Sequence, residues 1–168
     1  NAHAVNTGRP PELKNTQNDF FFLCRRAPDR LVQTVVELCQ QRLPDNMGIP
    51  ADQIQVLSPT RKGVCGTVNL NRALQAALNP PAAGKHQKPW GDMVFREGDR
   101  VMQTRNNYDV VWEKDDGSMG AGIFNGDVGV IREIDPSGEL ITIQFDDRTC
   151  VYTADLLNQL VMAYAMTV

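Results

Sequence analysis

The chain has 168 residues, 42% of which are hydrophobic, and a net charge of −3. This apolar content is enough for a packed core and excludes an intrinsically disordered chain. The sequence contains no run of about 18 apolar residues, so it predicts no membrane-spanning helix. Four widely spaced cysteines and two isolated histidines offer no ligand spacing for a metal site.

The cysteine pattern bears on the cellular compartment of the protein, and the two ends of the chain bear on whether it is part of a longer protein. Cysteines without a CxxC pair are typical of a reducing compartment, so we expect a cytoplasmic protein. The first residue is not methionine, and residues 163–168 form an apolar run. We therefore expect the chain to be a segment of a longer protein.

Positive charge is concentrated in the middle of the chain. Residues 61–108 contain eight basic and three acidic side chains, whereas residues 109–168 contain three basic and eleven acidic ones. Such an asymmetry is typical of a surface that faces anions. The same count also arises when the basic side chains lie on different faces, and both interpretations stay open.

The amino-terminal half alternates predicted strands and helices. After the polar residues 1–18, the apolar run at residues 19–24 suits a buried strand. A broad apolar face then predicts a helix that begins at Pro28 and ends at Pro44. The apolar residues 54–57 predict a second strand.

The second strand leads into a basic loop and a further helix. The β-α-β-α order of residues 19–78 indicates a parallel α/β sheet, in which such loops present backbone N–H groups to anions. An ordinary connection with a solvated Arg61-Lys62 pair is the alternative. The helix, which Asn79-Pro80-Pro81 ends, is predicted by apolar residues on one face: Leu70, Ala73, Leu74, Ala77 and Leu78.

The carboxyl-terminal half has a different pattern. Residues 79–92 are rich in Pro and Gly and mark a boundary. Residues 109–122, rich in glycine and acidic side chains, predict a long mobile loop, and the apolar residues 160–168 predict a third buried strand of the α/β sheet. Short alternating runs with turn signals between them predict a small antiparallel barrel or sandwich, at residues 100–104, 128–134, 140–145 and 149–152.

No catalytic arrangement is readable in the sequence. The phosphate-binding pattern GxxxxGK[ST] is absent. Asp99 and Asp127 each follow a glycine, and we interpret them as turn formers whose carboxylates bind the backbone. We therefore expect no catalytic residue in this segment.

Two groups of residues suit contacts with nucleic acid. Thr60 and Arg61 follow the second strand, where phosphate oxygens can be bound. Thr167 ends the last predicted strand, at the position where α/β sheets place ligand contacts, although threonine is also a common strand former.

The second group combines a cation, amides and an aromatic ring. Arg105, Asn106 and Tyr108 suit a nucleic-acid backbone with one stacked base. The alternative interpretation is a strand end with an Asn-Asn turn and a tyrosine in the core.

Several blocks of sequence, taken together and in order, resemble one family. They include residues 19–22, 56–63, 98–103, 105–108, 124–127 and 163–168. The family is that of the RecD-type helicases of superfamily 1, which move 5′→3′ on single-stranded DNA. The resemblance spans the whole chain and depends on the combination of blocks rather than on any single one.

This resemblance implies an α/β fold, namely a partial RecA-like parallel sheet layer with an inserted small SH3-like antiparallel β-barrel. Residues 1–90 and 153–168 would belong to the RecA-like second motor domain, and residues 91–152 to the barrel. The resemblance assigns contacts with the single strand to Thr60, Arg61, Thr167, Arg105, Asn106 and Tyr108.

The resemblance also implies a parent protein. This would be an ATP-dependent DNA helicase in recombination or repair, similar to the alpha subunit of exodeoxyribonuclease V. ATP and Mg²⁺ would bind outside this segment, which alone would be inactive. Its partners would be single-stranded DNA, the first motor domain and helicase–nuclease subunits, with no membrane. A stand-alone SH3-like adaptor and a segment of a Pif1-type or relaxase-linked helicase are the alternatives.

Overall fold

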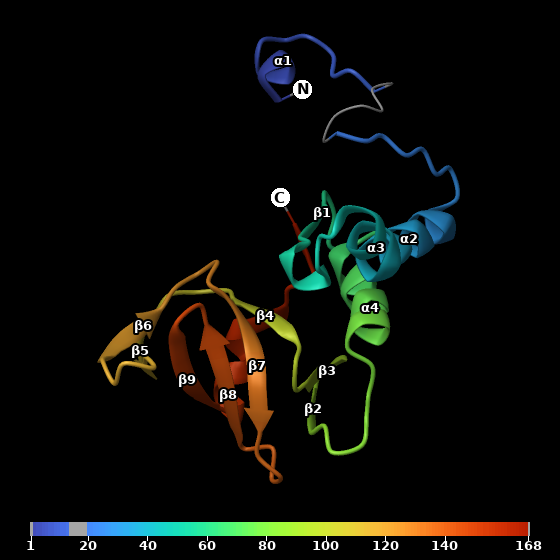
Figure 1. Cartoon of the computed structure of the whole chain (residues 1–168). Helices are drawn as coiled ribbons and strands as arrows, with labels where there is room; N and C mark the ends of the chain where they lie inside the picture. Colours follow the sequence, from blue (N-terminus) through green and yellow to red (C-terminus); the bar gives the residue numbers. More distant parts are fainter. Residues whose placement is uncertain (1, 14–19, 168) are drawn as a thin grey trace.

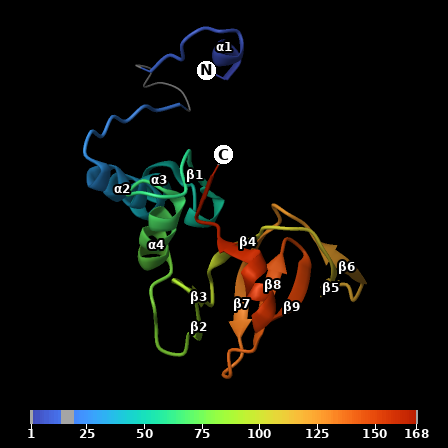
Figure 2. The ribbon, with the colours of Figure 1, turned by 180° about the vertical axis from the view of Figure 1, so that it is seen from behind.

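The structure is a computed structural model that describes residues 2–13 and 20–167. A short helix, α1 (Ala2–Asn6), lies apart from the rest of the molecule in both views (Figure 1 and Figure 2). The helices α2, α3 and α4 lie together on one side, and a large sheet lies on the other side.

The apolar run at residues 19–24 is not a strand, so that prediction is wrong. Residues 20–24 have no regular secondary structure, and the side chains of Phe21 and Phe22 are 53% and 54% exposed. Asp19 lies outside the described residues. A strand exists only where its backbone groups pair with a neighbouring strand, and an apolar pattern does not by itself provide that neighbour.

The first long helix continues further than the sequence suggests. Helix α2 (Pro28–Glu37) passes through a π-helical turn (Leu38–Arg42) into α3 (Leu43–Met47). The helix therefore does not end at Pro44 but at Gly48, whose φ of 65° terminates it. The π turn changes the hydrogen-bond pattern just before the proline, so the missing N–H and the ring of Pro44 are tolerated.

A small parallel pair of strands packs with helix α4. Strands β1 (Val56–Ser58) and β11 (Ala165–Thr167) pair in parallel, and α4 (Thr67–Leu78) buries Leu70 and Leu74 as its spacing predicts. Within the described residues this parallel sheet has two strands. The partial RecA-like layer that we expected, with residues 160–168 as a third strand, is therefore not shown.

The large sheet contains seven antiparallel strands in the order β10-β4-β7-β8-β9-β5-β6. The four predicted alternating runs each coincide with a strand to within a residue or two. No pairing joins the edge strands β10 and β6 in the part of the chain that the structure describes, so the expected barrel is not closed. The strands are β4 (Arg100–Gln103), β5 (Asn107–Glu113), β6 (Met119–Ile123), β7 (Val128–Ile134), β8 (Leu140–Phe145), β9 (Arg148–Thr153) and β10 (Leu160–Met162).

The segment that we expected to be a mobile loop, residues 109–122, is a β-hairpin. Strands β5 and β6 pair along it, and the N–H of Lys114 donates to the carbonyl of Ser118 at 2.9 Å to close the tip. A Cβ at Gly120 would lie 2.3 Å from the ring of Trp112. The glycine therefore makes room for an aromatic ring and does not loosen the chain.

The apolar residues 160–168 do not form one strand of the parallel sheet. Strand β10 pairs antiparallel with β4, and β11 then pairs with β1 after Ala163 and Tyr164. Val168 lies outside the described residues. A continuously apolar run fits a buried strand of either sheet, so its pattern does not show where the chain passes from one to the other.

A short hairpin lies between α4 and the large sheet (Figure 1 and Figure 2). It consists of β2 (Gln87–Trp90) and β3 (Met93–Arg96). The boundary that we expected at residues 79–92 thus includes a strand. Two 3₁₀ turns complete the fold, at Ala51–Gln53 and Ala154–Gln159.

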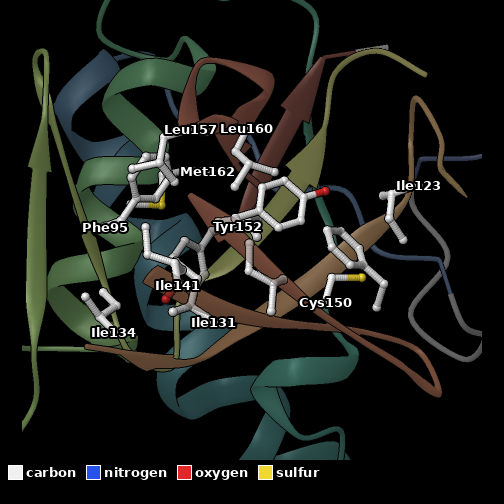
Figure 3. Close-up of a cluster of buried hydrophobic side chains, with 14 of the residues drawn as sticks. Phe95, Ile123, Ile131, Ile134, Ile141, Cys150, Tyr152, Leu157, Leu160 and Met162 are labelled. Atoms are coloured by element: carbon white, nitrogen blue, oxygen red, sulfur yellow. The ribbon is translucent and has the colours of Figure 1, made fainter. Parts of the chain in front are cut away.

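The main hydrophobic core lies on the large sheet and extends to α4. Figure 3 shows side chains from β3, β7, β8, β9 and the segment before β11 converging in one cluster. Phe95, Ile131, Ile141 and Tyr152 have no exposed surface.

None of the helices in residues 2–13 and 20–167 has both the length and the apolar character that crossing a bilayer requires.

Candidate nucleic-acid interface

The loop between β1 and α4 is held in a tight conformation. The hydroxyl of Ser58 donates to the carbonyl of Cys65 at 2.8 Å. A Cβ at Gly66 would lie 2.5 Å from the carbonyl oxygen of Lys62. The loop therefore requires glycine at this position, and its exposed residues Thr60 and Arg61 project from a fixed backbone.

The first N–H groups of α4 are bound within the loop. The N–H of Thr67 donates to the carbonyl of Thr60 at 3.0 Å, and the N–H of Val68 donates to that of Arg61 at 3.2 Å. These two donors, which a helix start would otherwise present to an anion, are thus satisfied. An anion at this loop would therefore not be bound by these two N–H groups.

Thr167 lies beside the same loop. In the register of the parallel pair it faces Ser58, and its side chain is exposed. Arg61 and Thr167 also line one cavity of about 570 Å³. Two of the predicted contacts, 106 positions apart in the sequence, are therefore brought together, with Thr60 on the same loop.

Asn71 fixes this arrangement, and the sequence interpretation did not give it a role. Its side-chain amide donates to the carbonyls of Met162 and Ala165 at 3.2 and 2.8 Å, and its oxygen accepts the N–H of Ala165 at 2.8 Å. These bonds join α4 to β11 and so position Thr167 relative to Arg61. The sequence signal for this role was the position of Asn71, three residues before the buried Leu74. This spacing puts its amide on the core side of the helix.

The second predicted group lies on the large sheet. The Arg105 guanidinium donates to Asn158 Oδ1 at 2.6 Å, and Asn106 Oδ1 accepts the N–H of Asn125 at 3.0 Å. Tyr108 is 67% exposed, so the alternative with a tyrosine in the core is wrong. None of the three predicted residues lines the cavity that Arg61 and Thr167 share.

Phe124 extends this second group. Its ring lies edge to face with that of Tyr108, with centroids 5.7 Å apart, and it is also exposed. The pair offers two aromatic surfaces on one side of the sheet. The sequence signal was an aromatic residue directly before the Asn125-Gly126-Asp127 turn.

A buried carboxylate joins the two parts of the molecule. Asp99 accepts hydrogen bonds from Gln75 and Asn79 of the α4 region at 2.6 and 2.7 Å, and from the hydroxyl of Tyr164 at 2.9 Å. It also accepts the N–H of Arg96 at 2.7 Å, as a turn former does. Burial raises the pKa of Asp99, although these hydrogen bonds favour its charged form.

Asp127 has the predicted turn role as well. Its carboxylate accepts the N–H of Phe124 at 3.0 Å and pairs with Arg148 at 3.1 Å. Among the described residues, no group of three or more His, Cys, Asp or Glu side chains could hold a metal ion. Asp99 and Asp127 are therefore best explained by structure.

Comparison with known proteins gives two results. Residues 70–145, from α4 to β8, match the family model of the SH3 domain of ATP-dependent RecD-like DNA helicases. The ATP-dependent RecD2 DNA helicase of Deinococcus radiodurans is 35% identical to the chain over 115 residues. This alignment covers 68% of the chain and 14% of the relative. The resemblance that the sequence blocks suggested is thereby confirmed.

Proposed function

We propose that this chain, a relative of the RecD-type DNA helicases, is the segment of a 5′→3′ DNA helicase that holds single-stranded DNA. The observation that carries the proposal is the meeting of Arg61 and Thr167 at one cavity beside the parallel pair β1–β11, with Thr60 next to Arg61 on the same loop. The hydroxyl groups and the guanidinium there suit phosphate oxygens.

The charge of Arg61 is available for such a contact. In the part of the chain that the structure describes, its guanidinium forms no hydrogen bond or ion pair, and the residue is exposed. Phosphate contacts carry no sequence information, so binding would be nonspecific and sensitive to salt. This behaviour suits a protein that moves along a strand.

The large sheet provides a second contact in this proposal. Asn106 and the exposed rings of Tyr108 and Phe124 would support the backbone and one stacked base, because every base has a flat face that an aromatic ring can cover. Arg105 already binds Asn158, so we propose that it contributes less to DNA binding than the other residues of this group.

The proposal places ATP and Mg²⁺ elsewhere in the parent protein. The sequence has no phosphate-binding loop of the GxxxxGK[ST] type, so we propose that this segment alone hydrolyses no ATP. The first motor domain of the parent would be its partner on the strand. A role in DNA repair or recombination, with helicase–nuclease subunits in the cytoplasm, extends the same proposal.

The salt dependence of DNA binding tests the phosphate contact. Fluorescence anisotropy with a labelled oligothymidylate would compare the variants Arg61→Ala and Arg132→Ala. Arg132 is an exposed arginine on β7, so its substitution removes the same charge at a different place. Arg61→Ala should weaken binding and reduce the slope of log K against log salt by about 0.7. Arg132→Ala should leave the slope unchanged. Equal slopes in both variants would argue against the proposed function.

A further inference from the structure

The cavity that Arg61 and Thr167 share is lined by an unusual set of side chains. It lies between one face of α4, strand β3 of the short hairpin, and strands β4, β10 and β11. Its volume of about 570 Å³ is within the usual range for ligand sites. Four of the six methionines in the chain line it, namely Met93, Met102, Met162 and Met166.

Methionine side chains give a cavity adaptable walls. The thioether is polarisable, the side chain has several rotatable bonds, and favourable contacts between sulfur and aromatic rings are common. A methionine offers no strong hydrogen-bond donor or acceptor that would read the edge of a base. Such walls suit flat aromatic groups of varied shape, without selection among them.

The charges on the cavity favour an anionic ligand. Arg61, Arg72 and Arg96 line it together with one carboxylate, that of Asp92. The Arg96 guanidinium is used internally, since it donates to Gln87 Oε1 at 3.1 and 3.0 Å. Among the described residues, the guanidinium groups of Arg61 and Arg72 form no such bonds, so two cations remain available at the cavity.

We infer that this cavity receives a base of the bound single strand, between the methionine side chains, while Arg61 and Arg72 hold the phosphates beside it. The inference rests on the proposed function and adds to it a base-binding cavity and a second phosphate contact, Arg72. An apolar peptide would use the methionines but leave both cations without a partner. A strand of nucleic acid uses both.

Methyl NMR of the whole chain, labelled with ¹³C at the methionine methyl groups, tests the inference even when binding is weak. The probes are an oligothymidylate and an oligomer of the same length with abasic sites. Oligothymidylate should shift the signals of the four cavity methionines, and the abasic oligomer should shift them at least about threefold less. Met47 and Met119, which are exposed outside the cavity, are internal controls that should not move.

A variant tests whether Arg72 is a second phosphate contact. Arg72→Ala should weaken oligothymidylate binding by about tenfold, as expected for loss of a charge-assisted hydrogen bond, whereas Arg132→Ala should not. Equal shifts with both oligomers, or shifts at Met47 and Met119 as large as those in the cavity, would overturn the base-binding cavity. If Arg61→Ala still reduced the salt slope in that case, the proposed function would stand without the cavity. If it did not, both would fail.

Discussion

The large antiparallel sheet and the layer formed by β1, β11 and α4 are held together in different ways. The sheet surrounds side chains with no exposed surface, such as Ile131, Ile141 and Tyr152, supplied by strands that are neighbours in the chain. The layer has two strands, and Leu57 on β1 is 59% exposed. Locally connected strands thus supply most of the core, which extends to Leu70 and Leu74 of α4, whereas the layer depends on contacts from distant parts of the sequence.

Polar side chains provide those distant contacts. Asn71 joins α4 to β11, and Asp99 joins the α4 region to Tyr164 just before β11. The predicted DNA contacts Arg61 and Thr167 lie in this layer. Their relative position therefore depends in part on a few hydrogen bonds, and stability and DNA binding should respond differently to substitution in the two regions.

The largest effect is expected in the core of the sheet. Phe145→Ala removes a ring with no exposed surface and should lower the free energy of unfolding by about 3–5 kcal/mol. Leu140→Ala, on the same strand but 48% exposed, should lower it by less than about 1 kcal/mol. Urea unfolding followed by circular dichroism measures both. Similar losses in the two variants would contradict the assignment of the main core to this sheet.

The second-largest loss of stability is expected for Asp99, which connects the two regions. Asp99→Ala leaves several buried donors without an acceptor and should destabilise the protein by about 3 kcal/mol. Hydrogen exchange should accelerate more at Ala165 in the layer than at Ile141 in the sheet. Asp115→Ala, which removes an exposed carboxylate from the hairpin tip, is the control. Equal acceleration in both regions would show that Asp99 does not separate them.

This difference also explains what the sequence could predict. The strands of the large sheet and helix α4 have clear periodic patterns, because one face of each element is buried and the other is not. The division of residues 160–168 between two sheets has no such pattern, because both environments are apolar. Residues 109–122 were misinterpreted because Gly120, which makes room for Trp112, resembles a glycine of a loop.

The candidate site was predictable in part for the same reason. Arg61 and Thr167 each follow or end a strand, so their type and position indicated a ligand-facing edge. The aromatic partner Phe124, the positioning role of Asn71 and the shared cavity depend on which elements meet in space. No local spacing contains that information.

A smaller effect is expected at the bond between α4 and β11. Asn71→Ala removes an amide that binds three backbone groups, and it should cost about 1–2 kcal/mol of stability. The N–H of Ala165 should exchange faster, and oligothymidylate binding should weaken because Thr167 is less well positioned. Asn69→Ala, in the first turn of the same helix, removes an amide that donates to the carbonyl of Val64 at 2.8 Å and serves as the control. An unchanged exchange rate at Ala165 would refute the positioning role.

The smallest effect concerns a turn of the sheet that is fully formed by local bonds. The Ser137 hydroxyl and the N–H of Leu140 donate to the Asp135 carboxylate and lower its pKa to about 2. This value is below the ordinary value of about 3.9 for an aspartate. The stabilisation of the folded protein by the ionised Asp135 carboxylate is therefore present above about pH 4 and is lost as the pH falls toward 2. Asp135→Asn should remove this part of the pH dependence, and Ser137→Ala should raise the pKa of Asp135. Carboxyl ¹³C titration by NMR measures the pKa, and a wild-type value near 3.9 would show that the turn does not depend on these bonds.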